Sequence, residues 1–328
     1  MIVTVTLNPA LDLTYAVDAL VPHGTHRVAA VTERPGGKGL NVARVLHTLG
    51  EPVLATGLLG GATGDRVAAL LAAEGVAGAF TPITGETRRT VAVVDSGDAT
   101  GFWEPGPVVE PAEWSNFLDD FRGLLGTASV VALSGSLPPG VPLDGYAVLI
   151  ALATAARVPA VLDTSGPALR HGLAAGPALA KPNADELSAL VPSRAAGRDG
   201  LVAAVRAVAA GPVVVSRGAA GLLAVSGADV WECVPPVPLV GNPTGAGDAC
   251  VAALARGLRD RAGWPDLLAD AVALSAAAVA APVAGAFDPD VYRSTRAVAV
   301  PARATSARTT STPATSAPSG DTHAGTNR

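Results

Sequence analysis

The sequence predicts an α/β protein of three layers, in which a mainly parallel sheet lies between two layers of helices. Short apolar segments such as residues 53–58 and 130–133 are typical of buried strands. They alternate with longer segments of helical periodicity, such as residues 112–125 and 143–156. Apolar strands between helices indicate a parallel sheet covered on both faces. Ligands of such folds bind beyond the carboxyl ends of the strands, so we expect the chemistry in the loops that follow strands.

This alternation continues in order along the chain. Predicted strands occupy residues 3–7, 53–58, 91–94, 130–133, 160–163, 213–216, 222–225 and 230–234. Predicted helices occupy residues 39–49, 65–73, 112–125, 143–156, 183–190, 201–210, 246–256 and 264–279. Residues 17–32 and 90–102 predict additional strands outside the main sheet, which would form a small β lid.

Composition argues against several classes of protein. The 328-residue chain is 49% hydrophobic and has a formal net charge of −5, with no basic patch, which argues against a nucleic-acid partner. It has no run of 18 apolar residues, so we expect no membrane span. Cys233 and Cys250 form no C-x-x-C pair, which argues against a disulfide scaffold or a zinc site. Because the first residues lack the pattern of a signal peptide, we expect a cytoplasmic protein.

Domain organisation follows from a change in composition near the C-terminus. Residues 1–292 carry the alternating strands and helices of one folded domain. After Tyr292 the chain contains no Leu, Ile, Phe, Tyr or Trp and is rich in Ala, Thr, Ser and Pro. Such a segment buries too little apolar surface to offset the entropy lost on ordering. We therefore expect residues 293–328 to be a disordered tail.

The motif T-G-A-G-D-A, residues 244–249, connects a predicted strand to a predicted helix. Gly245, Ala246 and Gly247 are small, so a substrate can approach the backbone, and free N–H groups at a helix start favour an anion such as a phosphoryl group. Asp248 would lie in the first helical turn, where its carboxylate could accept a proton from an attacking hydroxyl. An ordinary loop with an aspartate cap explains G-x-G-D alone equally well, but the strand and helix around the motif favour an active site.

With this context, the sequence resembles the ribokinase-like, or PfkB, family of carbohydrate kinases. The resemblance covers the body of the chain and leaves out only the tail. It implies a ribokinase-like α/β/α sandwich with a small β lid, ATP and Mg²⁺ as cofactors, and a homodimer formed through the lid. It also implies that Asp248 is the catalytic base, and that Gly245, Ala246 and Gly247 surround the transferred phosphoryl group and the nucleotide.

Two loops after predicted strands offer groups for a sugar. In L-N-P-A-L-D, residues 7–12, Asp12 supplies a carboxylate that can accept hydrogen bonds from sugar hydroxyls. A turn or cap residue is the alternative for Asp12, and the resemblance to 1-phosphofructokinases and tagatose-6-phosphate kinases favours substrate binding. In S-G-S-L-P-P-G, residues 134–140, Ser136 could reach the substrate or be a simple turn residue.

The glycine-rich loop P-G-G-K-G-L-N, residues 35–41, leads into a predicted helix. It is not a P-loop, because Gly39 follows Lys38 where a P-loop has Ser or Thr. The resemblance implies that the loop contacts the sugar through Gly37 and Asn41. Lys38 adds a cation that suits a substrate phosphate.

Arg27 and Arg88 are predicted to join Lys38 around that phosphate, because the planar guanidinium fork pairs well with phosphate oxygens. Solvated surface charges are the alternative. Their motifs resemble those of the phosphofructokinase branch, as does E-P-G-P at residues 104–107. Three residues depart from the pattern of the branch and leave the identity of the sugar open: His26, Thr90 and Trp103.

Two later motifs are assigned to the nucleotide and metal. In K-P-N-A-D-E, residues 181–186, Asn183 and Glu186 have the spacing of a capping box. The resemblance implies that they organise magnesium and phosphate through water molecules. It also places Ser216, Gly218 and Gly221 of V-V-V-S-R-G-A-A-G near the phosphates or ribose, with a plain hairpin turn as the alternative.

The function implied by the resemblance is ATP-dependent phosphorylation of fructose 1-phosphate to fructose 1,6-bisphosphate. Tagatose-6-phosphate kinase and 6-phosphofructokinase are the alternatives, followed by a kinase of nucleosides or unphosphorylated sugars and a non-catalytic sugar-phosphate sensor. A dehydrogenase is disfavoured, because G-L-L-G-G-A-T-G at residues 57–64 lacks the spacing of a dinucleotide-binding motif.

Overall fold

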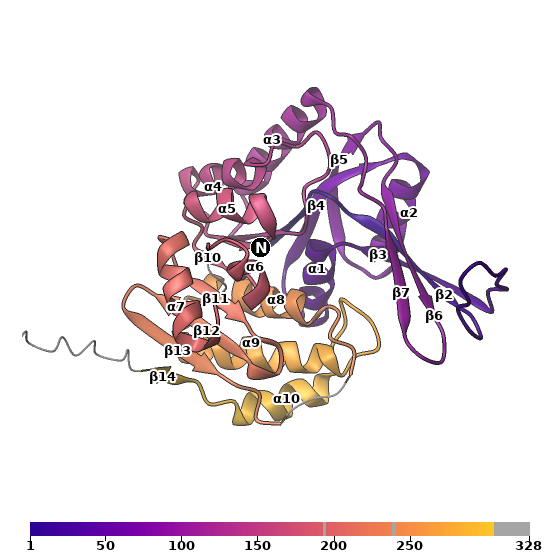
Figure 1. The fold of residues 1–328 in the computed structure, drawn as a ribbon. Helices are drawn as coiled ribbons and strands as arrows, with labels where there is room; N and C mark the ends of the chain where they lie inside the picture. The colour runs from indigo at the N-terminus through magenta and orange to yellow at the C-terminus, as the bar shows by residue number, and fades with distance from the viewer. Residues whose placement is uncertain (193–194, 238–240, 305–328) are drawn as a thin grey trace, which may run out of the picture.

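The computed structural model describes residues 1–192, 195–237 and 241–304, which form a main sheet and a smaller second sheet (Figure 1). The main sheet has ten strands in the order β14 (Ala302–Ala304), β13 (Asp229–Cys233), β12 (Leu222–Ser226), β11 (Val213–Ser216), β10 (Leu179–Ala180), β9 (Ala160–Asp163), β8 (Val130–Ser134), β1 (Ile2–Thr6), β4 (Val53–Gly60) and β5 (Ala77–Ile83). Pairing is parallel from β11 to β5 and antiparallel from β11 to β14.

Helices cover both faces of this sheet, which confirms the predicted three-layer α/β fold. One face carries α3 (Pro111–Leu125), α4 (Gly145–Ala155), α5 (Gly166–Ala174), α6 (Ala184–Ser188) and α7 (Gly197–Val208). The other carries α1 (Lys38–Thr48), α8 (Ala246–Arg259) and α9 (Trp264–Val279), with α10 (Pro289–Val298) against α9 and α2 (Gly61–Ala73) beside the second sheet. Among the described residues, none of these helices is long and apolar enough to cross a bilayer.

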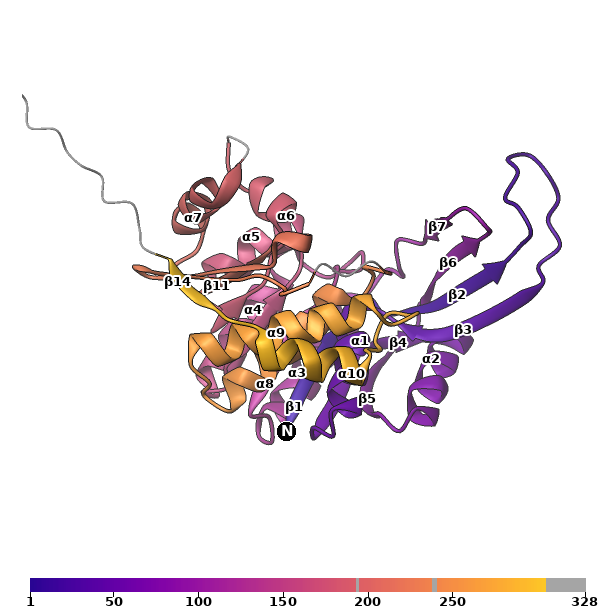
Figure 2. The same ribbon diagram turned by 90° about the horizontal axis from the view of Figure 1, so that it is seen from below.

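The second sheet projects from one edge of the body and corresponds to the predicted lid (Figure 2). Its strand order is β3 (Ala30–Gly36), β2 (Ala10–Ala16), β6 (Arg88–Val94) and β7 (Ala99–Trp103). The prediction for residues 90–102 agrees with β6 and β7. The prediction for residues 17–32 needs correction, because residues 17–29 form the connection at the far end of the lid and the strands lie on either side of it. Strand β2 does alternate, with Leu11, Leu13 and Tyr15 on one face and Asp12 and Thr14 on the other, but residues 7–12 were interpreted as a loop.

Several further elements lack a clear signal in the sequence. They are β5, α5, β10, α10 and β14. Strand β5, A-G-A-F-T-P-I, contains Gly78 and Pro82, and proline is tolerated there because β5 is the edge strand of the sheet. Strand β10 has only two residues, too few for any periodicity.

The C-terminal boundary of the folded body lies beyond the predicted one at residue 292. Helix α10 continues to Val298, and β14 adds an antiparallel strand to β13. Asp288 caps α10 by accepting hydrogen bonds from the N–H groups of Asp290 and Val291. The predicted tail is therefore wrong for residues 293–304, and residues 305–328 lie outside the described residues. Amino-acid composition could not reveal that residues 293–304 are folded, because these residues contact the rest of the domain mostly through polar groups.

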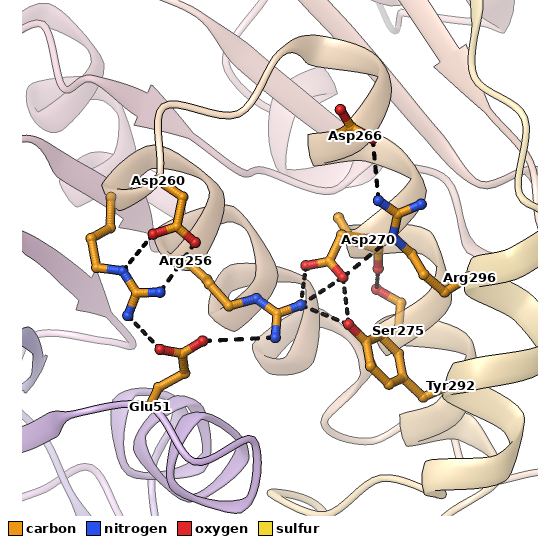
Figure 3. Close-up of polar contacts among 10 residues, drawn as sticks. Glu51, Arg256, Asp260, Asp266, Asp270, Ser275, Tyr292 and Arg296 are labelled. Carbon is orange, nitrogen blue, oxygen red and sulfur yellow. Dashed lines mark hydrogen bonds and ion pairs between the residues drawn. The ribbon is translucent and has the colours of Figure 1, made fainter.

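These polar contacts join α10 to the two helices beneath it (Figure 3). Arg256 on α8 donates to both carboxylate oxygens of Asp270 on α9 at 2.6 Å and to the Tyr292 hydroxyl at 2.6 Å. Arg296 lies 3.7 Å from Asp270, and Arg259 pairs with Glu51 before β4. Because Arg256 and Asp270 are mostly buried, their hydrogen bonds satisfy charges that would otherwise be costly. The network fastens the helix that begins at the T-G-A-G-D-A motif.

A truncation measures what this C-terminal segment contributes. We expect a chain that ends at Tyr292 to melt about 3–8 °C below one that ends at Ala304, which corresponds to ~1–3 kcal/mol. It loses the last turns of α10, the buried Thr295, the Arg296 ion pairs and β14. Calorimetry or circular dichroism checks this. Equal melting temperatures of the two chains would show that residues 293–304 contribute nothing measurable to the stability of the domain.

Candidate active site

The candidate active site lies where the carboxyl ends of β8, β9 and β10 meet the first turns of α1 and α8. Gly245 caps α8 with φ 89°, a left-handed conformation that favours glycine. A Cβ on Gly245 would also lie 2.9 Å from the Cα of Ala284, so the loop before α10 packs directly against the motif. This sharp turn brings Asp248 into the first turn of α8, as predicted from the sequence.

Asp248 is the centre of the site and is only 6% exposed. The Nδ2 of Asn41 on α1 donates to its Oδ2 at 2.8 Å. Burial, and then the negative charge of Asp163, raise the pKa of Asp248 to about 7, although Asn41, Lys38 and Lys181 act in the opposite direction. A carboxyl group with such a pKa is suited to take a proton from a hydroxyl near neutral pH.

Two ammonium groups lie beside this carboxylate, both next to Asp163. Lys38 Nζ lies 3.4 Å and Lys181 Nζ 3.3 Å from Asp163 Oδ1. Lys181 is buried, whereas the Lys38 side chain is 40% exposed. A Cβ on Gly247 would lie 3.5 Å from Lys181 Nζ, so this ammonium lies directly beneath the glycine motif. Cations and helix N–H groups together favour a phosphoryl group at this place.

The sequence predicts one cluster of three cations around a substrate phosphate, and in the structure the three have different surroundings. Lys38 pairs with Asp163 near Asp248, at the base end of the site. Arg88 lies instead at the lid end, where it donates to the carbonyl oxygens of Asn8 and Glu104. Arg27 is exposed in the connection at the far end of the lid. The spacing of these residues in the sequence does not show which end each one reaches.

Asp12 lies on β2 at the base of the lid, as the L-N-P-A-L-D motif suggested. Its carboxylate accepts a hydrogen bond from the Thr90 hydroxyl on the neighbouring strand β6. Burial raises the pKa of Asp12, while Thr90 and Arg88 lower it. The carboxylate rests on Gly36, where a Cβ would come within 2.1 Å of it. Thr90 is one of the three residues that differ from the phosphofructokinase branch. Its hydroxyl therefore orients the Asp12 carboxylate, which is predicted to bind the sugar.

The loops after β1 and β8 meet next to Asp12. The Nδ2 of Asn8 donates to the Ser136 hydroxyl at 3.2 Å and to the Pro105 carbonyl at 3.0 Å. The Oδ1 of Asn8 is buried without a partner among the described residues. Arg88, Pro105 and Gly106 also line an adjoining cavity of about 590 Å³, which does not reach Asp248. A Cβ on Gly37, before α1, would lie 2.8 Å from Thr6 and 3.3 Å from Pro9, so this glycine packs on the same loop after β1.

The other two departures from the branch are located in the lid. His26 accepts a hydrogen bond from the backbone N–H of Val21 at 2.7 Å, so it shapes the turn that carries Arg27. Trp103 ends β7, is largely exposed, and lies over Gly101 of the same strand. Trp103 is paired in register with Thr90, the residue that donates to Asp12.

The predicted nucleotide residues gather at the ends of β10 and β11. Asn183 and Glu186 form the predicted capping box at the start of α6, with bonds of 2.7 and 2.8 Å. The backbone of Asn183 forms an isolated parallel β-bridge with Ser216 of β11. The negative charge of Glu186 is close enough to Lys181 to raise the pKa of that lysine. These contacts join the two predicted nucleotide motifs to the site.

The two glycines of the predicted nucleotide loop differ in their surroundings. Gly218 has no atom within 4 Å of its Cβ position and is open to a ligand. Gly221 has φ 76°, and a Cβ there would lie 2.1 Å from the carbonyl oxygen of Cys233. The turn at Gly221 is therefore explained by its packing on β13, whether or not a nucleotide binds nearby.

Asp163 and Lys181 also belong to the site, although their sequence motifs were not assigned a role for them. Asp163 ends β9 and begins D-T-S-G, so a carboxylate at a strand's carboxyl end was the available signal. Lys181 begins K-P-N and is one of only two lysines in the chain. The backbone bond from the Lys181 N–H to the Leu162 carbonyl, 2.8 Å, brings the two residues together.

Comparisons with known proteins agree with this geometry. Residues 5–290 match the model of the pfkB family of carbohydrate kinases. Phosphofructokinase-2 from Escherichia coli, solved in complex with potassium, is 34% identical with a TM-score of 0.85, covering 90% of this chain and 98% of that one. The same enzyme was solved with fructose-6-phosphate, at a TM-score of 0.82, and as an inhibited tetramer.

Two more distant structures share the fold. A Thermotoga maritima protein named as a possible 1-phosphofructokinase is 24% identical with a TM-score of 0.81, covering 93% of this chain and 99% of that one. Ribokinase from Arabidopsis thaliana, with ribose and ATP, is 20% identical with a TM-score of 0.72, covering 90% and 98%. The fold is thus ribokinase-like. With the family match over most of its length, the chain belongs to the pfkB family of carbohydrate kinases.

Proposed function

We propose that this kinase transfers the γ-phosphoryl group of ATP to a hydroxyl of a ketohexose monophosphate, with Asp248 as the base. One observation carries the proposal: a buried carboxylate at the start of α8 lies beside two ammonium groups and a glycine-rich turn. Membership of a carbohydrate kinase family implies the use of ATP. The acceptor hydroxyl would lie between Asp248 and the phosphoryl group.

The chain's own residues supply each part of this reaction. Asp248 Oδ1 would take the hydroxyl proton, because Oδ2 already accepts from Asn41. Lys38, Lys181 and the N–H groups at the start of α8 would stabilise the charge of the transferred group. Asp12 would hold the sugar hydroxyls, and Arg88 at the base of the lid would bind the phosphate that does not react.

Magnesium fits this site as a partner of the nucleotide phosphates. Among the described residues, no group of three His, Cys, Asp or Glu side chains could hold an ion alone. Asn183 and Glu186 already bond each other in the capping box, so they suit contact with Mg²⁺ through water. When bound, the ion would neutralise phosphate charge. Ser216, Gly218 and Gly221 would lie near the rest of the nucleotide.

Fructose 1-phosphate is the proposed acceptor, converted to fructose 1,6-bisphosphate. The glycine loop with Lys38 and the E-P-G-P motif support it through their resemblance to 1-phosphofructokinases. Fructose 6-phosphate is a second candidate, supported by the 34% identity to the E. coli enzyme solved with that sugar. A coupled ADP assay with both sugars and tagatose 6-phosphate tests the assignment. A tenfold higher kcat/KM for either 6-phosphate sugar, about 1.4 kcal/mol, would overturn it.

The pH dependence should follow the ionisation of Asp248. Only the carboxylate can accept a proton, and the pKa of Asp248 is raised to about 7. We therefore expect kcat/KM to fall about tenfold for each pH unit below 7, and to level off above it. The measurement is a profile from pH 5 to 9 with a substrate-ionisation correction. A flat profile between pH 5 and 7 would contradict a base with this pKa.

We also place the protein in the cytoplasm as a homodimer formed through the lid. Cys233 and Cys250 are free buried thiols, which suits a reducing compartment. Val31 and Phe102 are both more than half exposed on one face of the lid, and such apolar residues commonly pack against a partner. Light scattering on Phe102→Asp tests this. The variant should be monomeric where the wild type is dimeric.

A further inference from the structure

Asp163 has two features that the proposed reaction does not by itself explain. Its side chain is 1% exposed, and one oxygen, Oδ1, lies within 3.4 Å of two different ammonium groups. The other oxygen, Oδ2, is buried and has no hydrogen-bond partner among the described residues. Buried polar atoms are usually satisfied, so this arrangement calls for a role.

The surroundings of Asp163 show what the carboxylate holds in place. The N–H of Gly135 donates to its backbone carbonyl at 2.9 Å, which ties β9 to the loop after β8. Lys181, 3% exposed, would lose the carboxylate that lies 3.3 Å from its ammonium group if Asp163 were neutral. Leaving a buried charge unpaired is strongly unfavourable. Lys38 is more exposed and has a long flexible stem, so the same carboxylate fixes its position.

We propose that Asp163 is a positioning residue, which holds the Lys38 and Lys181 ammonium groups side by side on the phosphoryl-transfer side of Asp248. The inference rests on the proposed function and names a residue that holds two of its cationic side chains in place. Because Asp163 is buried under both lysines, it acts through them and not by contact with substrate. Its charge also offsets part of theirs, so the two cations do not over-stabilise the Asp248 carboxylate.

The charged and polar side chains that act on Asp248 come from three other segments of the described chain. Helix α1 presents Lys38 and the neutral Asn41, β9 presents Asp163, and the chain after β10 presents Lys181. On α8 itself the nearest titratable group is the buried thiol of Cys250. Asp163 is therefore the negative charge that opposes two positive ones around the base. Its removal should leave Asp248 a weaker base and the two lysines less ordered.

The first test is steady-state kinetics of Asp163→Asn with Mg-ATP and the best sugar phosphate. We expect kcat to fall on the order of 10²-fold, with both KM values within about threefold of the wild type. The acidic limb of kcat/KM should move to lower pH, since the charge that raises the pKa of Asp248 is gone. Substrate ionisation is the same for both enzymes, so it cannot produce this shift.

Asp270→Asn is the matched control. Asp270 is also a buried aspartate paired with a basic side chain, Arg256, but it lies in the α8–α9–α10 network of Figure 3. This variant should lower the melting temperature and leave the acidic limb where it is. A shift of the same size in Asp270→Asn would show that the limb reports general loosening of the structure.

Double-mutant cycles show whether Asp163 acts through the lysines. On a Lys38→Met or Lys181→Met background, Asp163→Asn should cost much less in kcat than it does alone. The pair Asp163→Asn with Lys181→Met also removes both halves of the buried ion pair, so it remains foldable if the single variant does not. Equal costs on all backgrounds would overturn the proposal, because the carboxylate would then act through neither lysine.

The outcome is separable from that of the proposed function. Wild-type enzyme that phosphorylates no sugar phosphate refutes the function itself. Active wild-type enzyme with a folded Asp163→Asn variant that keeps kcat within threefold and an unshifted acidic limb refutes only the role of Asp163.

Discussion

Asp248→Asn is expected to lower kcat by on the order of 10²- to 10⁴-fold while the protein stays folded. The amide has the same shape and can still meet Asn41 after a side-chain flip, but it cannot take a proton from the acceptor hydroxyl. Removing a buried carboxyl with a raised pKa should not destabilise the fold, because a neutral group is less costly to bury. Steady-state kinetics and thermal melts measure the two effects.

Binding measurements separate the loss of the base from the loss of the site. Titration calorimetry should give Kd values for ATP and the sugar phosphate within a fewfold of the wild type, because Asp248 contributes to the transition state more than to binding. Turnover of a folded Asp248→Asn enzyme within threefold of the wild type would remove Asp248 from the role of base.

Gly36→Ala is expected to lower kcat/KM for the sugar phosphate by about 10²-fold, through Asp12. The new methyl group would occupy space within 2.1 Å of the Asp12 carboxyl carbon, so that side chain must move and lose its bond from Thr90. A displacement of about 1 Å in a substrate-positioning group can cost about this much. The KM for Mg-ATP should hardly change, since β3 belongs to the lid.

Gly123→Ala is the control for this substitution. Gly123 lies in α3, and nothing is within 4 Å of its Cβ position. Alanine is the better helix former, so this variant should be about 0.5–1 kcal/mol more stable with unchanged kinetics. If Gly36→Ala matched it in kcat/KM, Asp12 would not be a ligand of the sugar.

The sequence revealed the layers of the fold because its buried strands are short apolar runs and its helices are amphipathic. Strands β8 and β9 and helix α9 were predicted almost to the residue. The lid strand β2 was missed although its apolar and polar residues alternate, because residues 7–12 were interpreted as a loop after the first strand. Helix α10 was missed because Arg296 and Tyr292 join it to the body by polar contacts, which composition does not reveal.

The site was predictable where one short motif carries it. T-G-A-G-D-A placed Asp248 correctly at the start of a helix, because glycines and the helix start are local features. The partners of Asp248 are not local: Asn41 is 207 residues away in the sequence. The ion pair between Lys38 and Asp163 was not predicted for the same reason, since only the folded chain brings the two residues together.

Phosphorus-31 NMR tests the central claim most directly. The enzyme is mixed with equal amounts of Mg-ATP and fructose 1-phosphate, and with fructose 6-phosphate in a parallel sample. In at least one sample, we predict that the ATP resonances give way to those of ADP while a second sugar monoester resonance grows in equal amount, and that Asp248→Asn shows neither change in the same time. ADP that accumulates with inorganic phosphate alone, or no turnover of either sugar phosphate, would contradict the account.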